Sequence, residues 1–378
     1  MILKNPFNFI NQFFKNIKKQ TKTIYLNSNY YDKKISRIKF DNLVYKPSPH
    51  LLSSIIKYQK KKFNIDNISN KNLWNNENIK EKDFKRLNNF YWFFSLDLKS
   101  SKKITQSIIL SWIEKNFKYD SKSWEFDLTS KRIIAWLSSH NLTYENIYEE
   151  YKEKFNWMIQ KQANHLIYEI NHSKILDDKM LSCAAIILVG LCYKNHNKYL
   201  TYGLNLLKKI SNSTFDNNGF PKSRNIKQLI FYLKYFILIR EWFKEAQIEM
   251  PEMINENIYH LGRNYSFIWQ NIKTDILMNG NNISNNLEFD QYLKRFGYKF
   301  TNEKKKEFAG YTILYNKKIS IVMDTGSSPS LKYSHDYQSG ALSFEIISNG
   351  RKLITNCGYY KNENKKLNRL CRSTATHS

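Results

Sequence analysis

Apolar residues recur with a helical period from Asp83 to about residue 270. In SKKITQSIILSWIEKNF, the side chains of Ile104, Ile108 and Trp112 return to one face, as the 3.6-residue turn of an α-helix requires. The same pattern predicts further helices at about 145–171, 178–193, 197–211, 226–246 and 251–270. Short polar connections favour antiparallel packing of consecutive helices. The pattern therefore predicts an all-α domain of helical hairpins, arranged as a bundle, a solenoid or a closed toroid.

The hydrophobic period changes to two after residue 305. The runs Tyr311–Tyr315 and Ile319–Met323 flank a short polar turn, and Asn349-Gly350 separates two further alternating runs. An Asn-Gly pair in this setting is a strong hairpin signal, because both residues tolerate the positive φ angles of a tight turn. About four antiparallel strands are predicted, which are too few to form a stable independent sheet.

These patterns predict an α+β multidomain protein with four parts. Residues 1–80, rich in Lys and Asn, are expected to form an irregular lead-in, and residues 81–275 the helical domain. Residues 276–305 are expected to be a linker, because MNGNNISNNLE is dense in Asn and has no apolar period. Residues 306–378 are expected to begin an antiparallel β domain that is incomplete at Ser378.

Charge narrows the classes of partner. The sequence has 60 Lys and Arg against 33 Asp and Glu, a net charge of +27, which attracts polyanions. A general bias toward Lys, Asn and Ile explains this charge equally well. Because the basic residues are scattered among acids, a nucleic-acid partner is not predicted.

Targeting signals are not evident in the sequence. The N-terminal residues lack a secretory signal, and the longest apolar run, Met180–Tyr193, is too short to span a membrane. No transmembrane segment is therefore predicted, and the compartment stays open, with the cytoplasm as the interpretation from sequence alone. The four cysteines show no CxxC spacing and indicate no disulfide framework.

Four polar clusters could carry chemistry. They are KILDDKML with Asp178, GFPKSRN with Lys222 and Arg224, YSHDYQSGALSFE with His335, and the final RLCRSTATHS. Simpler explanations exist, since acids in the first turn of a helix stabilise its dipole and a polar loop can merely be solvated.

The order of these segments resembles the heparinase II/III family of polysaccharide lyases. The resemblance runs from FDLTSKRIIAWL through the apolar helix and GFPKSRN to GALSFEIISNGRKLITNCG and RSTATHS. It implies an N-terminal (α/α) toroid, a C-terminal antiparallel β-sandwich and β-elimination on a uronic acid in an acidic polysaccharide. By analogy with the family, the compartment would be the periplasm or cell envelope.

The resemblance also implies site residues. The elimination needs groups that transfer protons and groups that hold the uronate carboxylate. Family members have Asn-His where this chain has Asp177 and Asp178, and a tyrosine where it has Gln228, so Tyr232 one turn later is the substitute. The implied catalytic residues are Tyr232, His335, Tyr337 and His377. The implied substrate-binding residues are Arg224, Lys222, Asp178, Gln228, Gln338 and Arg372.

The family's structural zinc site falls on Gln338, Asn356 and His377. Neutral amides are poor zinc ligands, so no zinc or other cofactor is predicted. Because several of the family's catalytic and zinc-binding residues are replaced, a second hypothesis stays open. In it, the chain is a catalytically degenerate carbohydrate-binding or scaffold member of the family.

Overall fold

The structure is a computed structural model. It describes residues 6–37, 42–55, 74, 79–95, 102–145, 148–193, 197–280, 287–300, 307–338, 340–360 and 364–373. The chain divides into two compact units, which are described separately. Unit 1 contains residues 1–49 and 58–204, and unit 2 contains residues 50–57 and 205–378.

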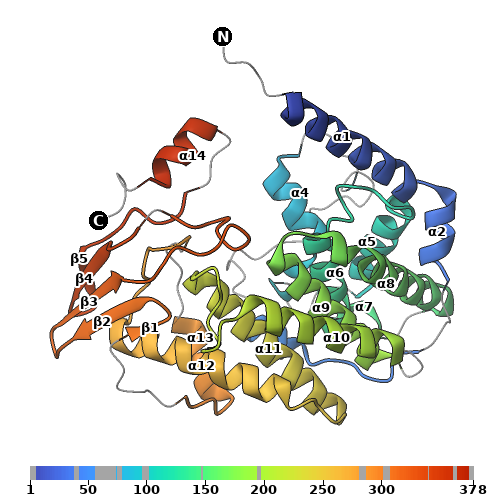
Figure 1. The fold of residues 1–378 in the computed structure, drawn as a ribbon. Helices are drawn as coiled ribbons and strands as arrows, with labels where there is room; N and C mark the ends of the chain where they lie inside the picture. The colour runs from blue at the N-terminus through green and yellow to red at the C-terminus, as the bar shows by residue number, and fades with distance from the viewer. Residues whose placement is uncertain are drawn as a thin grey trace. The chain divides into compact units, whose positions relative to one another are not determined.

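Unit 1 is helical throughout its described part (Figure 1). Its helices are α1 (Pro6–Leu26), α2 (Asn29–Ile35), α4 (Glu81–Asn88), η2 (Tyr91–Ser95), α5 (Lys102–Lys115), α6 (Phe126–Ser138), α7 (His140–Thr143), α8 (Glu149–Glu169), η3 (Ile170–His172), α9 (Leu176–Cys192) and the first part of α10 (Asn197–Thr214). The η elements are short 3₁₀-helices.

Helix α9 forms the centre of unit 1. Its residues from Met180 to Val189 are all buried, as expected for a helix that is apolar on every side. It packs against α6 and α8. Ser130 of α6 and Ser182 of α9 share a hydrogen bond of 3.0 Å, so small polar residues meet where these two helices approach each other.

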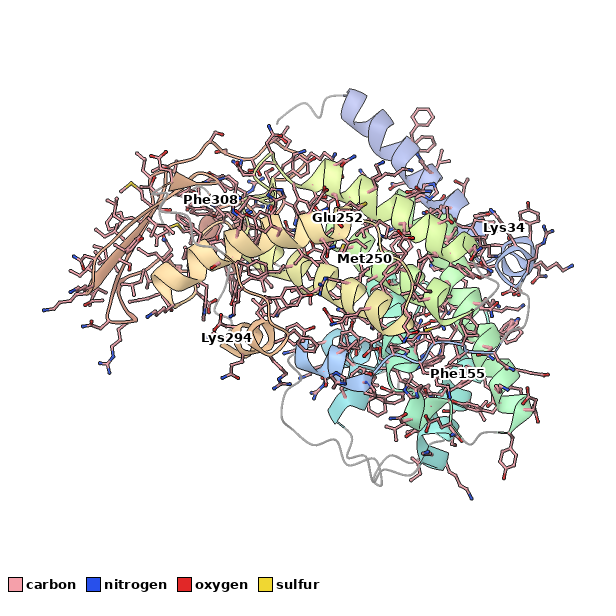
Figure 2. All side chains as sticks on the ribbon, turned by 90° about the horizontal axis from the view of Figure 1, so that it is seen from below. Lys34, Phe155, Met250, Glu252, Lys294 and Phe308 are labelled. Carbon is pink, nitrogen blue, oxygen red and sulfur yellow. The ribbon has the colours of Figure 1, made fainter. Side chains whose placement is uncertain are left out.

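Unit 2 combines helices with one sheet. Its elements are α3 (Pro49–Ile55), the rest of α10, α11 (Ile226–Ala246), α12 (Met253–Ile272), α13 (Leu287–Arg295), β1 (Glu307–Phe308), β2 (Tyr311–Tyr315), β3 (Ile319–Asp324), β4 (Phe344–Ser348), β5 (Arg351–Ile354) and α14 (Lys365–Cys371). The strands form an antiparallel sheet in the order β1-β2-β3-β4-β5. Side chains fill the space between the elements, while Lys294 of α13 is 75% exposed at the surface (Figure 2).

The sheet register separates a buried face from an open one. Ile313, Val322 and Glu345 lie opposite one another across β2, β3 and β4, and all three are buried. The turn between β4 and β5 is formed by Asn349 and Gly350, with φ angles of 48° and 77°. The predicted Asn-Gly hairpin is confirmed, because both turn residues adopt the left-handed backbone of such turns.

The predicted fold class is confirmed, with a largely helical chain followed by a small antiparallel sheet. The predicted helices at 226–246 and 251–270 correspond to α11 and α12, which pack against each other. Packing of consecutive helices does not hold everywhere, because α6 packs mainly against α9. Among the described residues, no helix is long and apolar enough to span a membrane.

Two parts of the predicted organisation are wrong. The lead-in of residues 1–80 contains helices α1, α2 and α3, because Lys and Asn at exposed positions do not prevent helix formation. The linker of residues 276–305 contains α13, and its beginning is buried: Ile276, Leu277, Met278 and Asn279 are each at most 6% exposed. Asn279 is buried there because its amide hydrogen-bonds to Tyr311 and Asp324 inside unit 2.

Candidate active site

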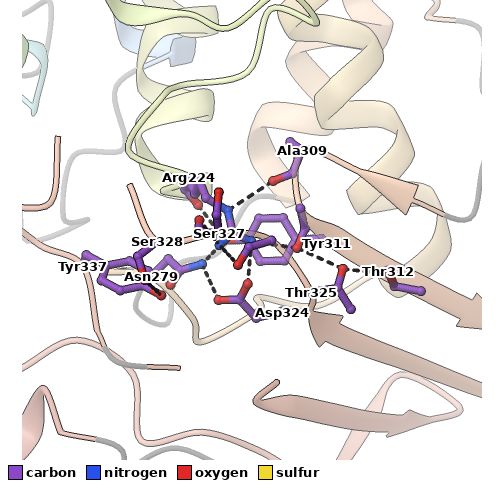
Figure 3. A network of polar contacts seen from close by, with 12 residues as sticks. Arg224, Asn279, Ala309, Tyr311, Thr312, Asp324, Thr325, Ser327, Ser328 and Tyr337 are labelled. Atoms are coloured by element: carbon purple, nitrogen blue, oxygen red, sulfur yellow. Dashed lines mark hydrogen bonds and ion pairs between the residues drawn. The ribbon is translucent and has the colours of Figure 1, made fainter. Parts of the chain in front are cut away.

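Arg224 lies in the loop before α11 and is buried against the sheet of unit 2 (Figure 3). Its Nη2 donates to Asp324 Oδ1 at 2.5 Å and to Gly310 O at 2.7 Å, and its Nε donates to Ala309 O at 3.3 Å. Its Nη1 donates to the carbonyls of Gly326 and Ser327, both at 3.1 Å. All five guanidinium N–H groups are therefore used inside the protein. Arg224 cannot bind a substrate carboxylate in this arrangement.

The same network continues through Asn279 and Tyr311. Asn279 Nδ2 donates to Tyr311 Oη at 2.7 Å and to Asp324 Oδ2 at 3.1 Å, and Tyr311 Oη donates to Arg224 O at 2.5 Å. Burial raises the pKa of Tyr311 above the ordinary tyrosine range, so this phenol remains a neutral donor. The network fixes the loop Gly219–Asn225, which contains both Lys222 and Arg224, to β2 and β3.

Glu345 of β4 is a second buried anchor. Its carboxylate accepts from Asn356 N at 3.0 Å, from Thr355 Oγ1 at 2.9 Å and from Leu277 N at 3.3 Å. Lys352 Nζ lies 3.0 Å from Oε2 and balances the charge. A buried carboxylate needs such a full set of partners, so the Glu of the Leu-Ser-Phe-Glu motif is structural here.

Gln338 and Asn356 occupy the positions of the expected zinc ligands. Gln338 is 1% exposed; its Oε1 accepts from Gly280 N at 3.0 Å and its Nε2 donates to Gly358 O at 2.8 Å. Asn356 is 3% exposed, and its Nδ2 donates to Phe344 O at 3.5 Å. His377 lies outside the described residues, and the described residues contain no group of three metal-ligating side chains. These amides connect backbone segments, and they do not fit a zinc site.

His335 is an exposed titratable residue of this region. Tyr337 N donates to Ser334 O at 3.1 Å and closes a turn, Ser334–Tyr337, which we name the His335 turn. The imidazole Nδ1 lies 2.7 Å from Asp336 Oδ1, and the His335 side chain is 80% exposed. Tyr359 Oη donates to the same carboxylate oxygen at 2.9 Å. Burial and this hydrogen bond raise the pKa of Tyr359 to about 12, so its phenol stays protonated.

Arg372 holds the His335 turn from outside. Its Nε donates to Tyr337 O at 3.0 Å, and its Nη2 donates to Tyr337 O at 2.8 Å and Ser334 O at 3.1 Å. The hydroxyl of Tyr337 accepts from Ser328 Oγ at 3.1 Å. Gly280 also packs against the turn, so closely that a Cβ on this glycine would lie 2.7 Å from Asp336 O. The turn is therefore fixed on two sides while the imidazole of His335 remains open.

The loop Gly219–Asn225 and the first turn of α11 contain two further predicted polar residues, Lys222 and Gln228. Lys222 Nζ lies 3.3 Å from Ser213 O and 5.9 Å from the centre of the Tyr333 ring, whose hydroxyl donates to the same carbonyl at 2.5 Å. Gln228 Oε1 accepts from Ser223 Oγ at 2.5 Å. Tyr333 thus connects the segment before the His335 turn to the end of α10, beside Lys222.

Tyr232 lies elsewhere in unit 2. Its side chain is fully buried in α11, with its ring centre 5.2 Å from that of Phe215 and 5.5 Å from that of Phe231. Tyr232 is a core residue in this structure. The position one helical turn after Gln228, which the sequence suggested for the substitute tyrosine, faces the interior of unit 2.

Asp178 belongs to unit 1, in the first turn of α9. It accepts a long hydrogen bond of 3.4 Å from Ser173 Oγ. Burial, followed by the nearby Asp127, raises its pKa to about 6. Asp178 lies on a cleft of about 530 Å³ whose wall includes Tyr119, Trp124 and Phe126.

Sequence reasoning missed Tyr359 and the aromatic wall of the cleft in unit 1. The pair Tyr359-Tyr360 after Gly358 was the available signal for the first. Nothing in the spacing of Tyr119, Trp124 and Phe126 indicates that these residues share a wall with Asp178, because helix packing brings them together.

Comparison with known proteins gives one sequence match and several fold matches. Residues 301–378 match the family described as heparinase II/III-like, C-terminal. No curated protein matches the sequence. The fold is similar to a crystal structure of heparinase III, with 16% identity, 96% of this chain and 68% of that chain covered, and a TM-score of 0.64.

Two further structures agree. A second heparinase III structure is 15% identical in sequence and has a TM-score of 0.60. The alignment with it covers 93% of this chain and 61% of the heparinase III chain. A heparan sulfate lyase from Pedobacter heparinus has 12% identity, covers 91% and 62%, and has a TM-score of 0.55. This chain thus spans roughly three fifths to two thirds of the length of these structures. Residues 301–378 thus match the heparinase II/III-like C-terminal family, and the fold along most of the chain is similar to that of these heparinase III and heparan sulfate lyase structures.

Proposed function

We propose that this chain acts as a polysaccharide lyase that breaks an acidic polysaccharide of the glycosaminoglycan type by β-elimination. The observation that supports it is the His335 turn, which presents an exposed imidazole oriented by Asp336 within the heparinase-like β domain. The heparan sulfate lyase among the similar structures supports the choice of polysaccharide class. The family fold alone would not fix an activity, so the proposal depends on His335.

His335 is proposed as the general base. When Nδ1–H donates to Asp336, Nε2 carries a lone pair and can accept the proton α to the uronate carboxylate. The electrons of that C–H bond form the new C=C bond, the bond to the glycosidic oxygen breaks, and this oxygen takes up a proton. Tyr337 is the proposed acid, because its hydroxyl accepts from Ser328 and keeps its own proton to donate.

A cation must neutralise the carboxylate while the negative charge develops. Arg224 is committed to the interior, so Lys222 takes this role in our proposal. Two of its neighbours are the backbone carbonyls of Ser213 and Asn212, at 3.3 and 3.5 Å, which orient the ammonium and leave it a further N–H. Arg372 positions the His335 turn, and Gln228 positions the Lys222 loop through Ser223.

The test is the ultraviolet absorbance of the unsaturated uronate formed from heparan sulfate, with alginate as a second uronan. His335→Ala should reduce the rate by roughly 10²–10⁴-fold, the usual contribution of a general base. His172→Ala is the matched control, because His172 is also exposed and paired with a carboxylate, Glu169 at 3.4 Å, but belongs to unit 1. Its rate should equal that of the unchanged protein.

Two results would contradict the proposal. Equal rates for His335→Ala and the unchanged protein would exclude His335 as the base. Binding of heparan sulfate without any absorbance change, at every pH between 5 and 9, would indicate a carbohydrate-binding member of the family instead.

A further inference from the structure

The cleft of unit 1 differs in charge from the chain as a whole. Its wall carries four carboxylates, those of Glu125, Asp127, Glu169 and Asp178, and two ammonium groups. The chain has a net charge of +27, so an acidic cleft is unexpected in it. A surplus of carboxylates at this point does not favour a uronate or sulfate group.

Three of these carboxylates are already paired. Lys22 Nζ lies 3.0 Å from Glu169, and Lys85 Nζ lies 3.3 Å from Glu125. Lys131, which follows Asp127 by one helical turn, lies 2.6 Å from it. The charges of Glu125, Asp127 and Glu169 are therefore balanced within the protein.

Asp178 is different from the other three. Within the described part of the chain, no lysine or arginine lies within ion-pair distance of its carboxylate, and its hydrogen bond from Ser173 is long at 3.4 Å. A carboxylate in the first helical turn normally has its ionised form stabilised by the helix dipole. Burial and Asp127 instead hold the Asp178 pKa at about 6. The ionised carboxylate of Asp178 thus has no lysine or arginine partner among the described residues. A cationic group of a ligand could supply the missing positive charge.

A second feature of the wall indicates a polar ligand. Trp124 is 1% exposed, lines the cleft, and its Nε1–H has no hydrogen-bond acceptor among the described residues. A buried donor without an acceptor costs free energy, and a hydroxyl oxygen of a ligand can satisfy it after a small shift. The half-buried rings of Tyr119 and Phe126 lie beside it and offer apolar surface to the carbon face of a sugar.

We propose that the cleft of unit 1 binds a sugar residue bearing a free ammonium group, as in N-unsubstituted glucosamine, with Asp178 as its counter-ion. Acidic glycosaminoglycan-type polysaccharides alternate uronates with amino sugars, so the inference rests on the proposed function for the choice of polymer. It assigns the amino sugar, and not the uronate, to unit 1. Asp178 is then the residue that determines specificity.

The test measures binding alone, by isothermal titration calorimetry of the full chain with a glucosamine tetramer and with its N-acetylated counterpart. The glucosamine tetramer should bind about tenfold more tightly, a difference of about 1.4 kcal/mol, because only its ammonium groups can pair with the Asp178 carboxylate. Asp178→Asn should remove this preference. Asp177→Asn is the matched control, since Asp177 is the neighbouring acid of the same helical turn and is absent from the cleft wall; it should keep the preference.

The pH dependence gives a second reading. Affinity for the glucosamine tetramer should rise from pH 5 to pH 7 as Asp178 ionises, while the amine is still largely protonated. The other charged groups facing the cleft are Glu125, Asp127 and Lys131 near or on α6, Lys22 on α1, Lys85 on α4 and Glu169 on α8. Each of them has an ion-pair partner within the protein. His165 stays neutral, because burial lowers its pKa to about 3.

Equal affinity for the two tetramers, or a preference that survives Asp178→Asn, would overturn this inference. Neither result depends on turnover, so a chain without lyase activity can still confirm it, and an active lyase can still contradict it.

Discussion

At the scale of single residues, several polar side chains act inside the protein. Arg224, Gln338 and Glu345 each connect segments that are distant in sequence, and each is at most 9% exposed. Long-range hydrogen bonds of this kind cannot be read from the local sequence, because an arginine or glutamine in a polar loop is normally solvated. His335 is the opposite case, since its side chain is 80% exposed.

Arg224→Lys should destabilise the chain, although the charge is kept. A lysine has one ammonium and cannot make five planar, diverging hydrogen bonds, so Asp324 and several carbonyls lose their donor. We expect the free energy of unfolding to fall by about 3 kcal/mol, as when a buried pair is broken. Urea denaturation followed by circular dichroism measures it. The exposed Arg351→Lys serves as control, and equal midpoints for the two variants would refute the structural role of Arg224.

Gln338 supports a prediction about metal content. Both ends of its amide are bound to backbone groups, and amides hold zinc weakly, so the purified chain should carry no stoichiometric zinc after dialysis. Elemental analysis by mass spectrometry decides this. One zinc per chain would show that other ligands replace those of the family.

At the scale of elements, the strongest periodic signals gave correct predictions. The helices α8 to α12 and the strands β2 and β3 begin and end within a few residues of their predicted limits. The errors concern α1, α2 and α3 in the predicted lead-in and α13 in the predicted linker, two regions rich in Asn. In such segments composition hides an apolar stripe, and contacts with the rest of a unit determine whether the helix forms.

A comparison of Gly280 with Gly350 measures how much the close contact between Gly280 and Asp336 matters for stability. Gly280 and Gly350 both have positive φ angles, 84° and 77°, so alanine strains the backbone equally at the two positions. Nothing lies within 4 Å of a Cβ on Gly350, whereas a Cβ on Gly280 would meet Asp336 O and Asn225 Nδ2, each at 2.7 Å.

Gly350→Ala should therefore cost about 1 kcal/mol of folding free energy, and Gly280→Ala about 2 kcal/mol more, because its neighbours must move. Gly280→Ala should also slow the elimination by displacing the His335 turn, while Gly350→Ala should leave the rate unchanged. Thermal unfolding and the absorbance assay give the two readings. Identical behaviour of both variants would show that the contact with Asp336 is unimportant.

At the scale of the molecule, the net charge of the chain is positive, whereas the wall of the cleft in unit 1 carries a surplus of carboxylates. The net charge of +27 attracts an acidic polymer at long range, whereas the carboxylate of Asp178 favours a cationic group at contact distance. A polymer of alternating uronate and amino sugar satisfies both conditions. The two proposed sites belong to different units, so His335→Ala should leave the preference for the glucosamine tetramer intact.

The sequence alone determined the fold class, most of the elements and the resemblance to the heparinase II/III family. Hydrophobic periods and the Asn-Gly turn are local signals, and they survive wide divergence. Only the tertiary structure decided which polar residues are free to react. Arg224 and Gln338 are used internally, Tyr232 is in the core, and Asp178 lacks a counter-ion among the described residues. These outcomes depend on contacts between residues far apart in sequence, because burial and hydrogen bonding are set by the neighbours that folding supplies.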